Sequence, residues 1–271
     1  MSLHVYNDLE QGSDAWLEAR RGIVTASVVG QLITISGAPQ TTVGCPECGA
    51  QAGDPCVSRA RKEPAPIKTT HGSRVAPTDA PPVITPSTSD TARALTALLV
   101  AERITGWVDP VYVSDDMMRG TLDEPIARAI YAEHYAPVNE VGFMVREEEW
   151  GRLGYSPDGL VGAEGLIEIK SRRAKKQLDT ILRDEVPAEN MAQIQAGLLV
   201  SGRAWCDYVS FCGGMPLYVK RVHPDRRWFE AIEGAVAAFE HAAVEMTDRY
   251  TNAIAGRPAT ERTTYDMEIT V

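Results

Sequence analysis

Apolar residues recur along this chain with two different spacings. In some short stretches they alternate with polar residues, as in half-buried strands, and in longer stretches they recur every three or four residues, as in amphipathic helices. In chain order the pattern predicts helices at 91–105 and 119–135, a strand at 138–149, a helix at 188–200, strands at 204–212 and 216–223, and a helix at 225–253. This order predicts an α/β fold in which a mixed central β-sheet is flanked by helices.

A hairpin in the middle of the chain is the first candidate for chemistry. Asp158 precedes a short glycine-containing turn, and the run 166–170 that follows alternates apolar and charged residues. In a strand Glu168 and Lys170 share one face, and a tight turn brings Asp158 back beside Glu168. Two carboxylates and an ammonium on one face suit a divalent metal. A salt bridge between Glu168 and Lys170 on an exposed strand gives the same pattern, so the residues alone leave both interpretations open.

The first 34 residues predict two short helices. One carries Trp16 and Arg20 and ends near Gly22, and Thr25 is placed to cap the next, at 26–34. Arg20 and Ser27 are suited to binding a phosphate, because arginine offers a charged fork and serine a hydroxyl near a helix N-terminus. A surface arginine and an ordinary helix-start serine are the alternative interpretation.

The segment 35–87 is rich in glycine, proline, threonine and serine and poor in large apolar residues. It contains Cys45, Cys48, Cys56 and His71, and the Cys-x2-Cys spacing aims two thiolates at one ion. The four ligands predict a tetrahedral Cys3His zinc site, which would fold a segment that has no core of its own. Unrelated thiols, a redox pair at Cys45 and Cys48, or an iron–sulfur cluster are the alternatives.

The zinc prediction divides the chain. Residues 1–34 and 88–271 would form the main domain, and 35–87 an inserted zinc module that ends in an extended proline-containing linker at 77–87. Two groups of basic residues stand out: Arg59, Arg61, Lys62, Lys68 and Arg74 in the insertion, and Lys170, Arg172, Arg173, Lys175 and Lys176 after the hairpin. Phosphate contact and simple solvation explain both groups equally well.

Composition limits the class of protein. The chain has 271 residues, of which 44% are hydrophobic and 24% charged, as in a globular protein with a full core. No apolar run is long enough for a membrane span, and the N-terminus lacks the layout of a signal peptide, so we expect a cytoplasmic protein. The formal net charge of −10 argues against a protein that coats nucleic acid, but it suits an enzyme that concentrates acid in its site.

The hairpin has the groups that metal-assisted phosphodiester hydrolysis needs. The carboxylates of Asp158 and Glu168, with the backbone carbonyl of Ile169, would bind Mg²⁺ or Mn²⁺ and leave positions for water and phosphate. A bound metal lowers the pKa of water, and Lys170 would orient that water or offset the charge that grows on the phosphorane.

Four separated motifs resemble, in the same order, those of the lambda exonuclease (YqaJ-type) family of phage recombination nucleases, within the PD-(D/E)xK superfamily. The motifs are the stretch 16–27, Arg119-Gly120 with Glu124, Ser156-Pro157-Asp158-Gly159-Leu160 with Glu168-Ile169-Lys170, and Met191-Ala192-Gln193-Ile194-Gln195. The resemblance runs through residues 11–34 and 89–250. The insertion at 43–76 departs from it, which leaves ring geometry and processivity open.

The resemblance implies a role for each matched residue. Asp158, Glu168 and the Ile169 carbonyl would bind the metal, Lys170 would be the catalytic lysine, and Glu124 would approach the metal-bound water from its helix.

It also implies how DNA is held. Gln193 would position the lysine or the scissile phosphate, and Arg20 and Ser27, assisted by Ser156, would hold the 5′-phosphate of a DNA end. Members of the family degrade one strand of duplex DNA from its 5′ end and work beside a single-strand annealing protein, and lambda exonuclease encircles DNA as a trimer.

The resemblance therefore favours a Mg²⁺- or Mn²⁺-dependent 5′→3′ exonuclease on linear duplex DNA. An endonuclease of the same fold is one alternative. A DNA-binding or adaptor protein, with the zinc module as its working part and an inactive nuclease core, is the other.

Overall fold

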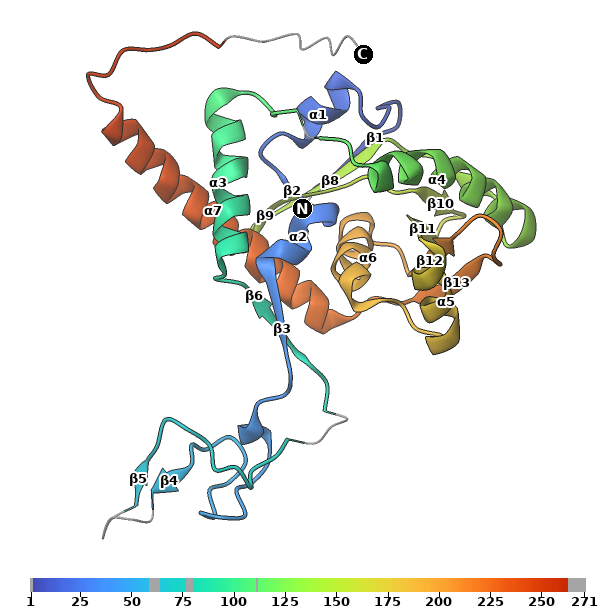
Figure 1. Ribbon diagram of the computed structural model, residues 1–271. Coiled ribbons are helices and arrows are strands. Elements are labelled where there is room, and N and C mark those ends of the chain that lie inside the picture. The colour runs from blue at the N-terminus through green and yellow to red at the C-terminus, as the bar shows by residue number, and fades with distance from the viewer. Residues whose placement is uncertain (1, 59–63, 77–79, 111, 263–271) are drawn as a thin grey trace.

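The computed structural model describes residues 2–58, 64–76, 80–110 and 112–262. Most of them form a core of helices and sheets, and a lobe made by residues 37–82 extends from it (Figure 1). Of the basic residues noted in the insertion, Arg59, Arg61 and Lys62 lie outside the described residues.

The core contains two sheets rather than one. The first, of four strands, has the order β1 (Ser2–Tyr6), β8 (Phe143–Glu148), β9 (Gly151–Tyr155) and β2 (Val24–Thr25). The second, of five, has the order β13 (Tyr218–Val222), β12 (Trp205–Phe211), β11 (Gly165–Ser171), β10 (Gly159–Val161) and β7 (Val138–Asn139). In the second sheet β11 and β12 are parallel and the other pairs antiparallel, which confirms the mixed α/β fold class.

Helices cover both faces of the five-stranded sheet. The described helices are α1 (Asp14–Arg20), α2 (Ala26–Val29), α3 (Asp90–Thr105), α4 (Asp115–His134), α5 (Ala174–Arg183), α6 (Ala188–Ser201) and α7 (Arg226–Ala253), of which α4 and α6 pack on opposite faces of this sheet. Because β11 alternates, Ile167 and Ile169 pack against Ala127 and Tyr131 of α4 on one face. Leu166 lies in the larger cluster on the opposite face, together with residues of α6 and α7.

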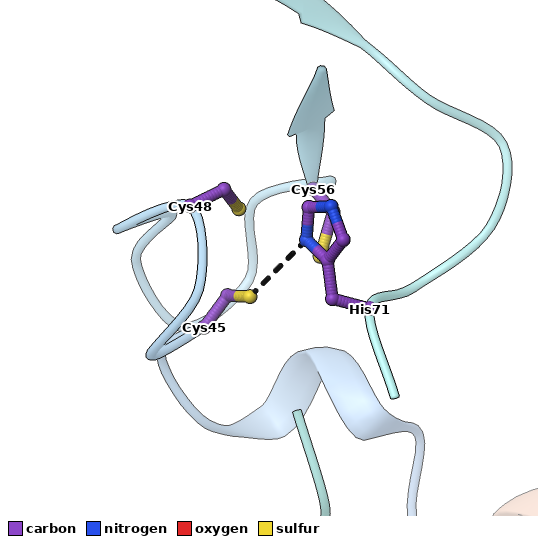
Figure 2. A group of neighbouring side chains, drawn as sticks. All are labelled: Cys45, Cys48, Cys56 and His71. Atoms are coloured by element: carbon purple, nitrogen blue, oxygen red, sulfur yellow. Dashed lines mark hydrogen bonds between the residues drawn. The ribbon is translucent and has the colours of Figure 1, made fainter. Parts of the chain in front are cut away.

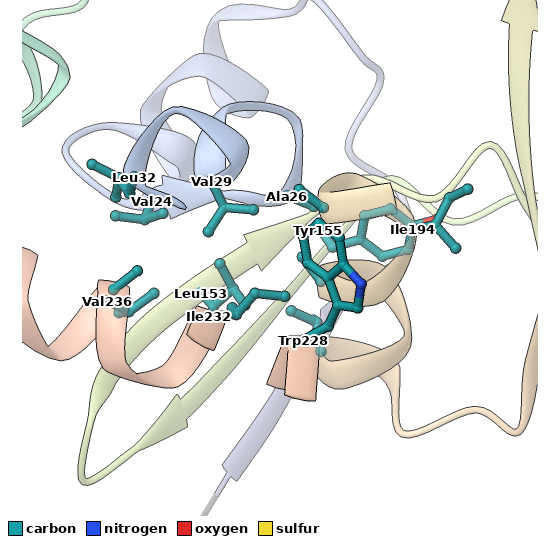
Figure 3. Close-up of a cluster of buried hydrophobic side chains, with 14 of the residues drawn as sticks. Val24, Ala26, Val29, Leu32, Leu153, Tyr155, Ile194, Trp228, Ile232 and Val236 are labelled. Atoms are coloured by element: carbon teal, nitrogen blue, oxygen red, sulfur yellow. The ribbon is translucent and has the colours of Figure 1, made fainter. Parts of the chain in front are cut away.

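The larger apolar cluster lies among α2, α3, α6, α7 and β9. Figure 3 shows Val24, Leu153, Tyr155, Ile194 and Ile232 meeting there, all at most 1% exposed. The sequence pattern predicted the helices α3, α6 and α7 and the β12–β13 pair near their observed bounds.

The predicted helix at 26–34 is wrong beyond its first turn. Helix α2 ends at Val29, a 3₁₀ turn spans Gly30–Leu32, and β3 (Ile33–Ser36) begins at once. The β-branched side chains from Ile33 to Ile35 favour the extended conformation, and β3 pairs with β6 (Val83–Pro86).

The paired strands β3 and β6 join the lobe to the core (Figure 1). Part of the segment expected as an extended linker, 77–87, is therefore a strand, and Pro77 lies outside the described residues. Within the lobe the regular elements are a 3₁₀ turn at Gln40–Thr42 and the short strands β4 (Val57–Ser58) and β5 (Ala65–Pro66). Among all the described residues, no helix has the length and apolar character that crossing a membrane requires.

Candidate functional site

The hairpin β10–β11 brings Asp158, Glu168 and Lys170 together as predicted. Gly159 pairs with Ile167 across the hairpin, so the residue before it lies beside Glu168. The backbone N–H of Ile169 donates a 2.6 Å hydrogen bond to Asp158 Oδ2. Lys170 Nζ donates to Glu168 Oε1 at 2.6 Å. The pairing of Glu168 with Lys170 is real, but Glu168 is completely buried, so it is not a surface salt bridge.

Two helices add side chains to this acidic centre. Gln193 of α6 accepts a 3.1 Å hydrogen bond on Oε1 from Lys170 Nζ, so the ammonium is held by Gln193 as well as by Glu168. Glu124 of α4 is half-buried and accepts a hydrogen bond from Arg128, one helical turn further on. The structure thus gathers the five residues expected at the centre from three separate elements: Glu124, Asp158, Glu168, Lys170 and Gln193.

Burial and mutual repulsion dominate the charges of the centre. The pKa of Asp158 is well above its usual range, because the carboxyl is buried and because Glu168 and Glu124 carry like charge nearby. Burial also raises the pKa of Glu124, against the attraction of Arg128. Burial alone would lower the pKa of Lys170, but the carboxylates of Glu168 and Asp158 outweigh it and raise that pKa above its ordinary value.

The donor set fits a divalent cation with a preference for oxygen. Asp158 Oδ2 and both oxygens of Glu168 accept hydrogen bonds, whereas no hydrogen bond from the described residues reaches Asp158 Oδ1. A hard cation placed among clustered carboxylates offsets the repulsion that raises the pKa of Asp158. Asp158, Glu168 and the carbonyl of Ile169 are therefore suited to hold Mg²⁺ or Mn²⁺.

A second polar cluster forms where Arg20, Ser27 and Ser156 meet. Arg20 Nη1 donates to Ser156 Oγ at 3.3 Å, and Arg20 Nη2 donates to Ser27 Oγ at 3.3 Å and to Thr25 Oγ1 at 3.4 Å. The indole N–H of Trp16 donates to Ser156 Oγ at 2.9 Å. One guanidinium surrounded by three hydroxyls is a set of donors suited to an anion with several oxygens.

The guanidinium of Arg20 is held by aromatic rings. It lies 4.0 Å from the centroid of the Trp16 ring and 5.7 Å from that of Phe143. Burial lowers the pKa of Arg20 to about 10, against the attraction of Glu102, and the side chain is still a cation at neutral pH. These contacts fix the plane of the guanidinium.

The helix that carries Arg20 is anchored at its end. Gly22 has a φ of +64°, and an added Cβ would lie 2.4 Å from Arg103 Cγ. Its N–H donates to Glu102 at 2.7 Å, and its carbonyl accepts from Arg103 Nε at 2.6 Å. Because Arg103 also pairs with Glu240 of α7, α1 is tied to two helices of the core.

The acidic centre and the arginine cluster share one loop. Ser156 belongs to the cluster and Asp158 to the centre, and only Pro157 separates them. Two residues of extended chain span at most about 7 Å, so the two sites are neighbours.

The four predicted zinc ligands come together in the lobe (Figure 2). The ligand atoms of Cys45, Cys48, Cys56 and His71 all lie within 4.8 Å of one another. The ring of His71 places Nδ1 3.4 Å from Cys45 Sγ, and its Nε2 lies 3.5 Å from a carboxylate oxygen of Glu47. Three thiols and one imidazole at this spacing fit structural zinc.

The thiols differ in acidity. Backbone N–H groups of Val57 and Ala50 outweigh the effect of burial and lower the pKa of Cys48 to about 6. The pKa of Cys56 is lowered by the backbone of His71 and, to a smaller extent, by Arg74, whereas burial raises the pKa of Cys45. The lobe therefore favours thiolates at two of its three cysteines, which is the form that binds zinc.

Arg74 is not a surface residue, so the expectation that it joins a basic patch is wrong. It is 0% exposed, and its guanidinium donates to four backbone carbonyls and to a ligand thiol. The carbonyls belong to Thr41, Val43, Gln51 and Asp54, at 2.8–3.2 Å. Arg74 thus joins the loops that surround the cysteines.

Two residues around the acidic centre, Arg128 and Tyr155, were missed by the sequence reasoning. Arg128 donates to the backbone carbonyl of Asp158 at 2.7 Å and to Glu140 at 2.8 Å, in addition to its pair with Glu124. The hydroxyl of Tyr155 donates to Glu168 Oε2 at 3.3 Å, and its ring packs on Gly197, where a Cβ would lie 2.7 Å away. The position of Arg128 one turn after Glu124 was a usable signal, whereas nothing in the sequence marks Tyr155.

Residues 67–204, about half of the chain, match the YqaJ-like viral recombinase domain. The chain belongs to this family. The family resemblance found in the motifs is confirmed, and the matched region contains Glu124, the hairpin and Gln193. Residues 11–88 match a second family, described as "Putative DNA-binding phage zinc finger domain", and this region contains all four zinc ligands. Together with the Cys3His cluster, it supports zinc binding by the lobe.

Solved structures extend the likeness beyond the family region. An alkaline exonuclease, LHK-Exo, from Laribacter hongkongensis is 26% identical, with a TM-score of 0.65 over 90% of this chain and 98% of that chain. Its complex with dAMP gives a TM-score of 0.64 at the same identity and coverage. A search of curated protein sequences found no significant match.

Proposed function

We propose that this family member is a Mg²⁺- or Mn²⁺-dependent exonuclease that digests linear double-stranded DNA in the 5′→3′ direction. Family membership and the likeness to an alkaline exonuclease support a phage-type nuclease. The observation that carries the finer proposal is the shared loop, in which Ser156 contacts the arginine cluster and Asp158 lies two residues away in the acidic centre.

The acidic centre would perform the cleavage. Asp158, Glu168 and the carbonyl of Ile169 would hold the metal, which would supply a water of lowered pKa and a positive charge beside the scissile phosphate. Lys170 is kept protonated by its carboxylate neighbours, so it would donate hydrogen bonds to the attacking water or to the phosphate oxygens. Gln193 holds the ammonium in place from α6, and Glu124 would accept a hydrogen bond from the water.

The arginine cluster would select the end of the strand. Arg20, Ser27 and Ser156 would bind the 5′-terminal phosphate, because a terminal phosphate offers more charge and more free oxygens than an internal one. The Cα atoms of Ser156 and Asp158 are at most about 7 Å apart, roughly the span of one or two nucleotides at 3.4 Å of rise each. A terminal phosphate bound in the cluster would therefore bring one of the first phosphodiester bonds to the metal. The dAMP bound to LHK-Exo is a nucleotide of that size.

The lobe would act separately from the chemistry. We propose that residues 35–87 form an inserted zinc-binding module and that 1–34 and 88–271 form the nuclease domain. The module lies beyond the β3–β6 pair, which suits a clamp on DNA or a docking element. A single-strand annealing protein as partner, assembly as a trimer, and action in the cytoplasm of a bacterial host follow from the family resemblance and belong to the same proposal.

Digestion of three substrates tests the proposal: linear duplex with 5′-phosphates, the same duplex with 5′-hydroxyls, and a covalently closed circle, each with Mg²⁺. We expect the duplex with 5′-phosphates to be digested fastest and the duplex with 5′-hydroxyls more slowly. The closed circle should not be cleaved. Cutting of the circle would identify an endonuclease. Tight binding without metal-dependent turnover would identify a DNA-binding protein.

Variants separate the two sites in this experiment. Lys170→Ala should lower the rate on every linear substrate by about a thousandfold, since it removes the cation beside the scissile phosphate. Arg20→Ala should lower the rate on 5′-phosphorylated ends by roughly ten- to a hundredfold and leave the 5′-hydroxyl rate nearly unchanged. Arg226→Ala is the matched control, because its side chain is 90% exposed and pairs with Glu230 on the surface of α7.

A further inference from the structure

The hydroxyl of Ser156 occupies an unusual position in the arginine cluster, because two donors converge on its oxygen. The indole N–H of Trp16 reaches Ser156 Oγ at 2.9 Å, and Nη1 of Arg20 reaches the same atom at 3.3 Å. Neither group can accept a hydrogen bond, since an indole nitrogen and a guanidinium are donors only. Ser156 Oγ is therefore the acceptor in both contacts.

This arrangement determines where the serine proton points. A hydroxyl has two acceptor lone pairs and one O–H donor, and Trp16 and Arg20 use the two lone pairs. Within the described part of the chain, no acceptor receives the proton of Ser156. The remaining direction is open to an incoming acceptor, and an anionic phosphate oxygen is such a group.

We propose that Trp16 is a positioning residue that orients the hydroxyl of Ser156 to donate to the terminal phosphate, and that it thereby sets the preference for phosphorylated 5′ ends. The inference rests on the proposed function, because it needs the arginine cluster to be the phosphate site. Trp16 acts through a second contact as well, since its ring lies 4.0 Å from the guanidinium carbon of Arg20 and fixes the cation beside the serine.

The chemistry predicts a difference between two substitutions of Trp16. Phenylalanine keeps an aromatic face for Arg20 but removes the N–H, so the hydroxyl of Ser156 regains a free lone pair and can rotate away from the phosphate. Leucine removes the face as well. Trp16→Phe should therefore lose only the affinity that comes from the oriented hydroxyl of Ser156. Trp16→Leu should in addition lose the affinity that comes from a correctly placed Arg20.

Equilibrium binding of short duplexes tests this inference without cleavage. All proteins carry Lys170→Ala and are measured with no added divalent metal, using duplexes that differ only in a 5′-phosphate or a 5′-hydroxyl. Trp16→Phe should weaken binding of the phosphorylated end by about three- to tenfold, which is the range of one hydrogen bond between neutral groups, and leave the hydroxyl end unchanged. Trp150→Phe, in the β8–β9 turn, is the matched control and should change neither.

A double-mutant cycle identifies the route of the effect. In a Ser156→Ala background, Trp16→Phe should change binding of the phosphorylated end by less than about twofold, because the hydroxyl it orients is gone. The role given to Trp16 would be overturned if Trp16→Phe weakened binding of 5′-phosphate and 5′-hydroxyl duplexes equally. It would also be overturned if the fold-loss in the double variant equalled the product of the two single fold-losses. A parent protein that binds both ends alike would instead refute the phosphate site itself, and with it both proposals.

Discussion

The lobe contains a completely buried arginine and the core a partly buried one, and the two arginines have different roles. In the lobe, Arg74 is 0% exposed and joins four backbone carbonyls around a cluster of three buried cysteines. In the core, Arg128 joins Glu124, Glu140 and the carbonyl of Asp158, and it follows Ala127, which packs in the apolar cluster between α4 and β11. In the lobe, the polar network around Arg74 takes the place of a hydrophobic core. In the main domain, the apolar clusters stabilise the fold, and the polar network around Arg128 positions the residues of the acidic centre.

The comparison predicts that zinc is required by the lobe and not by the core. In the double variant Cys45→Ser, Cys48→Ser, zinc content should fall from one per chain to near zero, because a segment without an apolar core folds only with its metal. Limited proteolysis should then cut within residues 37–82, while the thermal transition of the core is retained. Elemental analysis that finds iron, or a lobe that resists protease without metal, would contradict the account.

Substitution of Arg74 should have the next largest effect. Arg74→Met fills a similar volume but leaves four carbonyls without their donors, at a cost of about 3 kcal/mol or more. Since folding of the lobe and zinc binding are coupled, competition with a chelator should show zinc affinity reduced by about a hundredfold. Lys68→Met, an exposed position in the same lobe, is the control and should alter affinity little. Normal zinc affinity in Arg74→Met would show that the lobe is held by other contacts.

In the core, substitution of Arg128 should reduce the rate of DNA digestion more than it reduces thermal stability. Arg128→Lys keeps the charge but cannot bridge Glu124, Glu140 and the carbonyl of Asp158 at once, because an ammonium lacks the guanidinium fork. We expect duplex digestion to slow by roughly tenfold and the Mg²⁺ concentration for half-maximal rate to rise, with a change in Tm of only a few degrees. Arg183→Lys on the surface of α5 serves as control. A large fall in Tm without any change in Mg²⁺ dependence would assign Arg128 to the fold.

The smallest effect concerns the pH dependence of stability. The pKa of Asp158 is raised in the folded, metal-free protein, so its contribution to stability is fully present below about pH 4, the ordinary pKa of aspartate. It is lost as pH rises toward the raised pKa, because the unfolded chain ionises more easily. Asp158→Asn should remove this loss and raise the metal-free Tm near neutral pH by about 2–4 °C.

Added Mg²⁺ should raise the Tm of the wild type, because the cation offsets the charge of Asp158, and it should leave the Tm of Asp158→Asn unchanged. Asp179→Asn, on the exposed surface of α5, is the matched control for the loss of a carboxylate. The structure indicates that the carboxylates repel one another. A Tm of Asp158→Asn below that of the wild type, near neutral pH and without metal, would contradict this repulsion.

Much of the site could be predicted because its residues occupy positions that a pattern fixes. The alternation in β11 places Glu168 and Lys170 on one face, and the short turn returns Asp158 to their side. The cysteine spacing similarly brings four ligands together with few intervening elements. Contacts between distant segments, such as Arg20 with Ser156, came from the family resemblance rather than from any local pattern.

The parts that sequence reasoning missed depend on burial of polar groups. Helix α5 exposes Leu182 to 75% and buries Gln177, which bonds to Ser210 and to the carbonyl of Pro216, so its polarity pattern is inverted. From the sequence, Arg74 has the properties of one more surface cation. Only its hydrogen bonds to backbone carbonyls show that it is buried. Only the tertiary structure shows where such groups find their partners.

The direction of digestion, measured on one labelled strand, tests the central claim most directly. A linear duplex with 5′-phosphates carries the label at the 5′ end of one strand in one sample and at its 3′ end in another, and both are incubated with Mg²⁺. The account predicts that the 5′ label appears at once as a short nucleotide product, that the 3′ label stays on long fragments until late, and that Lys170→Ala abolishes both. Early release of the 3′ label, or equal release by wild type and Lys170→Ala, would contradict it.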